Sequence, residues 1–580
     1  MRKPKIRLYA PFIVLVLAQA AFVAFAPSRG ETNDPLAGLE TVGGPLAIGD
    51  VGDAGDGSGL GTGSTTPGAA SPDGSTGTGS VEGAGGPIGG GGEGDGGGPT
   101  GPTETQPQAV AAGDTSHCVG DRQTDLIESS PPCVPAFGGN NGGATYPGVT
   151  GEEIKLIRFE CNPNEQVNAI LATQGLAATK AETDEMIAAT IEWMQDTYEF
   201  YGRTISYEHT VGDCELTPPD PARSRQAASE VAKKQPAFII HYSGGSTTHD
   251  TWTQNGIVSL GGPTQANQFF AGRRPFRWDV FPNGTETADW IGEYVCKKLA
   301  GKNASNAGQL IHPTIGGRNT PRKFGILTFD NGTGETRPNA ERAKALIENC
   351  SGDNVPLLFY ESDINRAEEQ TRVTVAKLIE EGVTSLVCLC DAIAPVFLTN
   401  GLTRNNYFPE HILSGAYLMD YDILGRLYDP AQWAHAFGPS HLSNPVPFEQ
   451  SDATKIWRAS GRSGSPCASC NLITGYMTMI GSMIHSAGPD LNPLTIEQGL
   501  VGARSTVGGW AATGGNPFVY LLKFGPEDYT AISDFREVYW NPTKRSEIDG
   551  KNGAYEPMNG GRRYAGGELD GSFDIPAKPQ

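Results

Sequence analysis

The sequence lacks the local motifs that identify most enzyme classes. It contains no G-x-S-x-G, no H-E-x-x-H, no G-x-x-x-x-G-K-S/T, and no G-x-G-x-x-G that opens a helix after a strand. Its nine histidines are scattered, and His241 and His249 lie near each other in sequence without a third ligand, which makes a poor metal site. We therefore expect a protein that is not an enzyme and that has no cofactor.

Positive charge is also scarce. Lysine and arginine number 43 against 65 acidic residues, which gives a formal net charge of −22. The sequence has no basic run with interleaved aromatic residues. An acidic surface repels nucleic acid and anionic lipid headgroups and keeps an exported protein soluble. Nucleic acid is therefore excluded as a partner.

Aromatic residues are almost missing from residues 31–115, which consist mainly of glycine, serine, threonine, proline and acidic residues. Such a segment cannot bury enough apolar surface to offset the entropy lost on ordering. We expect a disordered, glycine-rich linker, whose root-mean-square reach as a random chain is about 50 Å.

The N-terminus carries a targeting signal. Four basic residues among the first seven precede an uncharged apolar stretch at residues 8–26. Ala18-Gln19-Ala20 offers a cleavage site, but an apolar run of about nineteen residues can also span a bilayer as an anchor. No cysteine lies near the end of this stretch, which excludes a lipid anchor there. We expect residues 1–30 to place the protein outside the cytoplasm, secreted or anchored, and to be its only contact with the membrane.

Ten cysteines fit an exported protein, because an even count in an oxidising compartment indicates disulfides. Their order along the chain favours disulfides between neighbouring cysteines, Cys118 with Cys133 and Cys161 with Cys214. The C-x-x-C at residues 467–470 has the spacing of a redox motif but lacks thioredoxin-like surroundings. We expect structural bridges.

From residue 148 on, short β-rich runs alternate with helical ones. Apolar residues between positions 186 and 198, for example, recur at helical spacing. Strands are expected at 154–159, 204–209, 238–242, 324–329, 357–360 and 385–390, and helices at 183–201, 222–234, 337–348 and 365–381. This alternation predicts parallel sheets with right-handed crossovers. There are too many units for one small sheet, so the predicted fold class is α/β with two doubly wound parallel-sheet lobes joined by a hinge.

The order of these pieces resembles type I periplasmic binding proteins, the group that contains the leucine- and branched-chain amino-acid-binding receptors of ABC importers. The resemblance covers roughly residues 146–545 and rests on five segments: PGVTGEEIKLI at 147–157, FIIHYSGGS at 238–246, GIVSLGGPT at 256–264, FRWDVF at 276–281 and RKFGILTFD at 322–330. Two features depart from the group: Asn331-Gly-Thr-Gly334 stands where an aromatic residue is usual, and a tail extends beyond about residue 541.

The resemblance and the composition together divide the chain into six expected parts. They are a signal peptide or anchor at 1–30, the linker at 31–115, lobe 1 with a cysteine-containing lead-in at 116–276, lobe 2 at 277–445, a return segment completing lobe 1 and the hinge at 446–545, and a C-terminal tail at 546–580.

Ligands of open α/β sheets lie beyond the carboxyl ends of the strands. The turn Ser243-Gly-Gly-Ser-Thr-Thr248 favours a ligand carboxylate there, because glycine permits close approach and a following helix offers unpaired N–H groups. The same turn also suits an ordinary strand-to-helix connection with a Ser or Thr N-cap. The candidate ligand-binding residues are Arg158, Tyr242, Ser243, Gly244, Gly245, Ser246, Gly262, Thr264, Asp330, Asn331, Asp391 and Tyr417.

Three of these candidates have alternative interpretations or depend on the resemblance. Arg158 indicates an acidic ligand group, or it pairs with surface carboxylates. The resemblance implies that Asp391 and Tyr417 contact a ligand amine or side chain from the second lobe, while Asp391 also suits a helix N-cap. Trp252, which is not among the candidates, either stacks on an apolar part of the ligand or belongs to the core.

The resemblance implies an extracytoplasmic solute-binding protein that captures a small, carboxylate-bearing or amino-acid-like ligand for the membrane permease of an ABC importer. Three alternatives remain open: a ligand-sensing receptor head of the same fold, an envelope hydrolase with an unrecognised site, and a structural envelope protein.

Overall fold

The computed structural model describes residues 113–214, 220–242, 245–262, 265–330, 332, 334–502 and 524–571. They fall in one compact unit that runs from Ala112 to Gln580. The expected export segment and nearly all of the expected linker lie outside the described residues. Within the described ranges, no helix is both long enough and apolar enough to cross a membrane.

The first lobe is built on a sheet of five parallel strands in the order β2-β1-β3-β4-β5. The bounds are β1 (Glu153–Cys161), β2 (Thr204–Gly212), β3 (Phe238–Ile240), β4 (Val258–Leu260) and β5 (Arg277–Trp278). This 2-1-3-4-5 order is that of a doubly wound sheet, whose strand order reverses between β1 and β3.

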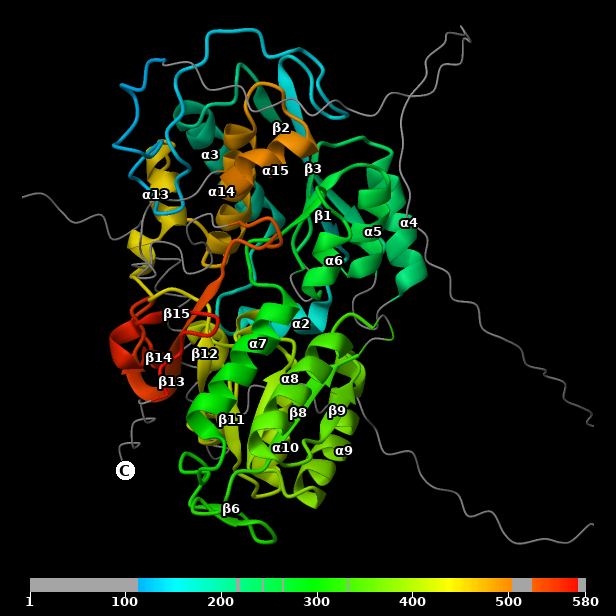
Figure 1. The fold of residues 1–580 in the computed structure, drawn as a ribbon, viewed down its shortest axis with the longest axis vertical. Coiled ribbons are helices and arrows are strands. Elements are labelled where there is room, and N and C mark those ends of the chain that lie inside the picture. The colour runs from blue at the N-terminus through cyan, green and yellow to red at the C-terminus, as the bar shows by residue number, and fades with distance from the viewer. Residues whose placement is uncertain are drawn as a thin grey trace, which may run out of the picture. The chain divides into compact units, whose positions relative to one another are not determined.

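Helices cover both faces of this sheet (Figure 1). On one face α4 (Pro221–Ala232) packs on α5 (Ser246–Gln254), and on the other α14 (Cys470–Ala487) packs on α3 (Lys180–Thr197). The remaining helices of this lobe are α2 (Glu165–Ala172), α6 (Asn267–Ala271), α13 (Asp452–Ala459) and α15 (Pro493–Gly502). Trp252 on α5 is fully buried among residues of β1, β3 and α4, so it belongs to the core.

The second lobe contains a larger sheet in the order β14-β13-β12-β11-β10-β8-β9, with β15 paired to β13. Five neighbouring strands, β9, β8, β10, β11 and β12, are parallel and repeat the 2-1-3-4-5 order. The strands β13, β14 and β15 pair antiparallel. The bounds are β8 (Phe324–Phe329), β9 (Leu357–Tyr360), β10 (Ser385–Leu389), β11 (Glu410–Ile412), β12 (Ala436–Ser440), β13 (Asp534–Arg545), β14 (Asn552–Pro557) and β15 (Arg563–Ala565).

Four longer helices cover the second sheet, and shorter elements connect its strands. The longer ones are α7 (Gly284–Tyr294), α8 (Arg337–Ser351), α9 (Ala367–Glu380) and α10 (Ala394–Arg404). The shorter ones are η3 (Val295–Leu299), β6 (Leu310–His312), β7 (Gly316–Gly317), η4 (Ile364–Arg366), η5 (Ala416–Leu418), α11 (Asp422–Gly425), α12 (Pro430–Trp433), η6 (Phe448–Gln450) and η7 (Asn559–Gly561).

Alternation along the central strands divides the apolar side chains between two cores. Val387 and Leu389 of β10 join the core under α7 and α8. Leu386, Cys388 and Cys390 point to the opposite core, under α9 and α10. Successive side chains of a strand point to opposite faces, so a continuous apolar run predicts a strand covered on both sides. The same alternation puts the two cysteines on one face, where they form a disulfide.

The chain crosses from the first sheet to the second directly after β5. The backbone of Asp279 donates to the carbonyl of Tyr529 (3.1 Å) and accepts from the N–H of Ala531 (3.0 Å). Its carboxylate accepts from the Tyr476 hydroxyl (3.2 Å) and from the Gly261 N–H (2.9 Å). The segment that leaves the first lobe after β5 is therefore hydrogen-bonded to the later segment that leads into β13. Through the Asp279 carboxylate it is also bound to Tyr476 and Gly261 of the first lobe.

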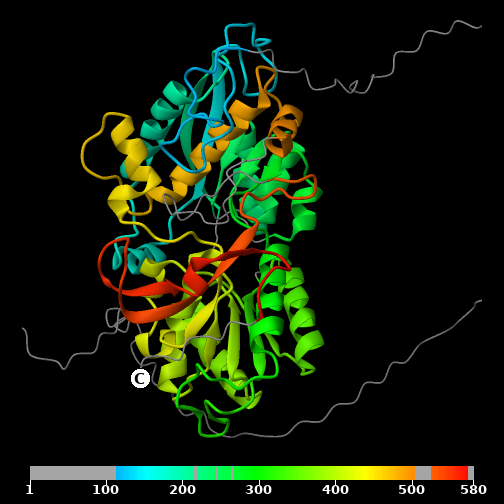
Figure 2. The ribbon, with the colours of Figure 1, turned by 60° about the vertical axis from the view of Figure 1, so that its left-hand side comes forward.

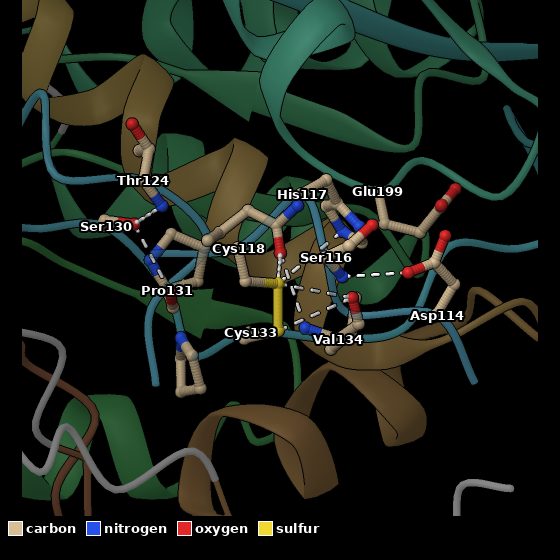
Figure 3. Close-up of a disulfide and its surroundings, with 12 residues drawn as sticks. Asp114, Ser116, His117, Cys118, Thr124, Ser130, Pro131, Cys133, Val134 and Glu199 are labelled. Carbon is tan, nitrogen blue, oxygen red and sulfur yellow. Dashed lines mark hydrogen bonds between the residues drawn. A yellow bond between two sulfur atoms is a disulfide. The ribbon is translucent and has the colours of Figure 1, made fainter. Parts of the chain in front are cut away.

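All ten cysteines form disulfides, five in total. Two of them are the pairs that local order favours, Cys118–Cys133 and Cys161–Cys214. Figure 3 shows the first, which fixes the lead-in loop of the first lobe. This loop is tied to α14, because Nε2 of His485 lies 2.9 Å from the carbonyl of Pro132.

The expected division of the chain needs a correction after residue 445. We expected 446–545 to complete the first lobe and 546–580 to be a tail. The helices α13 and α14 do pack on α3 of the first lobe, but β13 pairs with β12, and β14 and β15 pair with β13 (Figure 2). Phe535 and Tyr564 of these strands complete a second-lobe core. The added strands also cover the edge that β12 would otherwise expose.

Candidate ligand-binding site

A cavity of about 840 Å³ lies where the carboxyl ends of the two sheets meet, and we call it the cleft cavity. The first lobe lines it with α2 and with residues at or near the ends of β1, β2 and β3, and the second lobe with α9, α10 and the ends of β9 and β10. In both sheets these elements surround the point at which the strand order reverses, which is where open α/β sheets bind ligands.

Five lining side chains from the first lobe form what we call the first wall: Arg158, Glu160, His209, His241 and Tyr242. Arg158 donates through Nη2 to Glu160, and Nε2 of His209 lies 2.9 Å from the same carboxylate. Burial raises the pKa of Glu160, but the hydrogen bond from His209 and the charge of Arg158 outweigh it, so this pKa lies below its ordinary value. Glu160 is therefore held as a carboxylate that positions Arg158.

The guanidinium of Arg158 keeps unused donors. The residue is 6% exposed, and its Nε and Nη1 atoms have no hydrogen-bond partner. The guanidinium carbon lies 5.5 Å from the centroid of the Tyr242 ring. Because a buried donor without a partner costs about 1–3 kcal/mol, a ligand acceptor at this position would remove an existing cost.

His241 and Tyr242 add two more buried polar atoms without partners. Nδ1 of His241 lies 2.9 Å from the carbonyl of Phe159, while its Nε2 has no partner. Burial lowers the pKa of His241 to about 4, so the ring is neutral at pH 7. The Tyr242 hydroxyl has no partner either, and burial raises its pKa. The first wall therefore presents several groups that can still form hydrogen bonds.

The second lobe contributes Tyr360, Ser362 and Asp391, which we call the second wall. Oδ2 of Asp391 accepts from the Tyr360 hydroxyl (2.8 Å) and from the Ser362 hydroxyl (3.2 Å). Oδ1 accepts from the N–H groups of Ile393 (2.9 Å) and Ala394 (3.0 Å) at the start of α10. Asp391 thus accepts from N–H groups at the start of α10, close to the N-cap role that the sequence offered as an alternative, although the N-cap position itself is Ile393, and its oxygens are occupied.

A second cavity of about 200 Å³ adjoins the crossing segments, and we call it the hinge cavity. Tyr242 and Ala392 line both cavities. Tyr417 also lines the hinge cavity, with its ring 5.3 Å from that of Phe329 and its backbone in the left-handed region (φ 50°, ψ 31°). A non-glycine residue keeps such a conformation only where its surroundings impose it. The other lining residues include Phe281, Leu472 and Tyr476.

The turn that favoured a ligand carboxylate holds a carboxylate of the chain itself. Oε1 of Glu335, from the second lobe, accepts from the N–H and from the hydroxyl of Ser246, each at 2.5 Å. A Cβ at Gly245 would lie 3.1 Å from the same oxygen. Ser246 therefore contacts the opposite lobe, and Gly245 leaves room for that contact.

The remaining candidates do not join either cavity, or lie outside the described residues. The carbonyl of Gly262 accepts from buried Arg277 (3.0 Å), and Asp330 pairs with Arg337, so both have contacts within their own lobes. Ser243, Gly244, Thr264 and Asn331 lie outside the described residues.

No metal-binding group was found among the described residues, in which no three His, Cys, Asp or Glu side chains gather suitably. The rings of His241 and His249 are 6.2 Å apart, and Nδ1 of His249 lies 2.9 Å from the Ser259 hydroxyl. Both rings are therefore buried inside the first lobe, where His241 also borders the cleft cavity.

The list of candidate residues left out Glu160, His209, Tyr360 and Glu335, although Glu160 begins a turn at the end of the first predicted strand where a ligand is expected. Glu160 and His209 lie near the ends of neighbouring strands, and β1 pairs with β2 so that Arg158 stands opposite His209. The charged residues near the end of the first strand were a usable signal for this cluster. For Glu335 the local signal was only an acid before a helix, which usually indicates interaction with the helix dipole.

Comparison by sequence finds no matching family model and no matching curated protein. Solved structures do resemble the chain. One is an ABC transporter substrate-binding protein from Aeropyrum pernix (TM-score 0.48, 11% identity, 72% of this chain and 98% of that one). Another is an ABC transporter solute-binding protein from R. palustris in complex with 4-hydroxybenzoate (0.48, 12%, 72% and 98%). A third is a possible leucine/isoleucine/valine-binding protein from Rhodopirellula baltica (0.46, 12%, 70% and 96%).

These neighbours are type I periplasmic binding proteins, the group that the sequence resembles. The two doubly wound lobes of this chain agree with the fold that the resemblance implies. The predicted class, α/β with two doubly wound lobes, is confirmed by the 2-1-3-4-5 strand order in both sheets of this chain.

Proposed function

We propose that this protein is a non-enzymatic, extracytoplasmic solute-binding protein, which captures a small ligand between its lobes and presents it to the permease of an ABC importer. The observation that carries the proposal is the cleft cavity, which both lobes line and in which buried donors of Arg158 have no partner. A site that binds and releases a solute needs such unsatisfied groups on a wall that can be closed over.

The ligand chemistry follows from the charges around the cavity. Nε and Nη1 of Arg158 are donors only, so they select an acceptor such as a carboxylate or carbonyl oxygen. Acidic side chains outnumber basic ones in the lining: Glu160, Asp213, Glu361, Asp363 and Asp391 against Arg158 and Lys180. This surplus favours a ligand that also carries an ammonium group. A carboxylate-bearing, amino-acid-like solute fits both requirements.

The location is supported by the five disulfides, because such bonds persist in oxidising compartments outside the cytoplasm. The basic and apolar export signal at the N-terminus supports the same location. The permease partner follows from the proposed transport role. It would recognise the surface that lobe closure creates.

The test is thermal unfolding of the protein against amino acids, simple carboxylic acids, amines and neutral amides. A ligand that binds only the folded state stabilises it by about 2.7 kcal/mol at a hundredfold excess over Kd. We expect stabilisation by amino-acid-like solutes, and loss of this effect in Arg158→Met. Stabilisation that persists in the variant would reject the proposed recognition, and no response to any solute class would reject small-solute binding.

A further inference from the structure

The start of α5 is capped from the opposite lobe. Its N-cap residue is Gly245, and no side chain of the first lobe forms a capping hydrogen bond there. The donors of Ser246, its backbone N–H and its hydroxyl, are instead satisfied by one carboxylate oxygen of Glu335. Glycine at the N-cap leaves the space that this carboxylate uses, since a Cβ there would come within 3.1 Å of it.

Glu335 is held at this position by the start of the next helix. It directly precedes Thr336, the N-cap residue of α8, whose hydroxyl donates to the carbonyl of Phe329 at the end of β8. The carboxylate is thus carried by the second lobe, and its Oε1 accepts both hydrogen bonds from the first lobe. A helix N-terminus favours an anion through its unpaired N–H groups and its dipole. The contact therefore joins the lobes at a point where a free carboxylate would also bind.

We infer that Glu335 is an internal occupant of the anion position at the start of α5, which holds the lobes together without ligand and denies this position to small free carboxylates. This role goes beyond the proposed function, and it does not depend on the identity of the solute. It also explains why the free donors of the cleft belong to Arg158: the other anion position is already filled. Glu335 is accordingly a residue that sets specificity, and a conformational change that opens the lobes must break its contact with Ser246.

The test measures the distance between the lobes in the full-length, ligand-free protein. Spin labels at Lys233→Cys in the first lobe and Arg404→Cys in the second occupy exposed positions, with 68% and 55% of the native side chains accessible. Double electron–electron resonance then compares wild type, Glu335→Ala and Glu335→Gln. Glu341→Ala is the matched control, because it removes an acid of α8 whose side chain is 57% exposed.

We expect Glu335→Ala to shift the distance distribution to longer values by more than about 2 Å, the size of typical lobe or loop rearrangements. Glu335→Gln keeps an acceptor but no charge, so its shift is smaller, and Glu341→Ala shows none. Acetate, added alone, should reverse the shift in Glu335→Ala by taking the vacated position, and should leave wild type unchanged.

Two results would overturn the inference. One is an unchanged distance distribution in Glu335→Ala, and the other is an acetate effect of equal size in wild type and variant. If Glu335→Ala does not fold, Ser246→Ala removes one donor from the opposite side and must lengthen the distance instead. None of these readouts involves the solute of the cleft cavity, so their outcome is independent of the test of the proposed function.

Discussion

The two walls of the cleft cavity differ in how far their polar groups are satisfied. On the second wall, each oxygen of Asp391 accepts two hydrogen bonds from its own lobe. On the first wall, Arg158, His241 and Tyr242 each keep a buried polar atom without a partner. Under the proposed function, the first wall would recognise the ligand and the second would form a rigid surface that closes over it.

This difference also has a cost in stability. Unsatisfied buried groups destabilise the free protein, whereas the network around Asp391 stabilises it. We therefore expect substitutions in the first wall to act mainly on binding and on pH dependence, and substitutions in the second wall to act mainly on stability. Four predictions follow in order of decreasing effect.

The largest effect concerns the disulfides beside the two walls. Cys161 and Cys214 line the cleft cavity and are 53 residues apart, whereas Cys388 and Cys390, before the second wall, are 2 apart. By loop-closure entropy, replacing the first pair with alanine costs about 4 kcal/mol of unfolding free energy and replacing the second about 1 kcal/mol. Urea unfolding of the two double variants measures both losses. Equal losses would contradict an effect set by the length of the loop that each disulfide closes.

The next effect is the response of the first wall to acid. Burial lowers the pKa of His241 from 6.5 to about 4, so the unfolded chain takes up a proton that the folded protein refuses. The contribution of His241 to stability is present above pH 6.5 and is lost as the pH falls towards 4. This loss amounts to about 3 kcal/mol in wild type and is absent in His241→Gln.

The measurement is the unfolding free energy of wild type and His241→Gln from pH 7.5 to pH 4. Comparing the two cancels the titrating groups that do not interact with His241, whereas Glu160 and Arg277, whose charges act on His241, stay coupled to it. The curves should converge or cross as the pH falls. Parallel curves would contradict a buried neutral His241.

Six strands, β1 to β3 in the first lobe and β8 to β10 in the second, could be predicted from the sequence because each carries its own signal. The run Phe238-Ile-Ile is apolar on both faces, and β3 is indeed buried throughout. The strands β13 to β15 carry no such signal in isolation, because their place depends on pairing with β12. Their prediction as a return segment and tail was wrong for this reason.

The candidate site was less predictable, because hydrogen-bond satisfaction is a property of the folded chain. Arg158 and Asp391 looked equally available in the sequence. The fold occupies Asp391 with the start of α10 and leaves two nitrogens of Arg158 unpaired. The contact of Glu335 with Ser246 spans 89 positions, and no local pattern reports a contact of that range.

The third prediction compares two substitutions of Arg158 in the first wall, one to methionine and one to lysine. Arg158→Met removes the free donors, and a hydrogen bond to a charged group contributes about 1.5–3 kcal/mol, so affinity should fall about 100-fold. Arg158→Lys keeps the charge without the planar fork and should lose less. Isothermal titration with the solute found by thermal unfolding measures both. Unchanged affinity in Arg158→Met would remove Arg158 from the site.

The smallest effect comes from two tyrosine hydroxyls, one on each wall. The Tyr360 hydroxyl donates to Oδ2 of Asp391 (2.8 Å) and accepts from the N–H of the same residue (2.9 Å). The Tyr242 hydroxyl is buried without a partner. Tyr360→Phe should therefore lower the unfolding free energy of the ligand-free protein by about 1–2 kcal/mol, while Tyr242→Phe should leave it unchanged or raise it slightly.

The same pair of variants should reverse its order when affinity is measured. Tyr242→Phe removes a hydroxyl from the surface shared by both cavities, so it should weaken solute binding, whereas Tyr360→Phe removes one that is already engaged with Asp391. Because each substitution removes one tyrosine hydroxyl and keeps the ring, the change in side-chain volume is the same in both variants. Similar losses of stability in both variants would mean that the two walls are equally satisfied, and the division into a recognising and a closing wall would then fail.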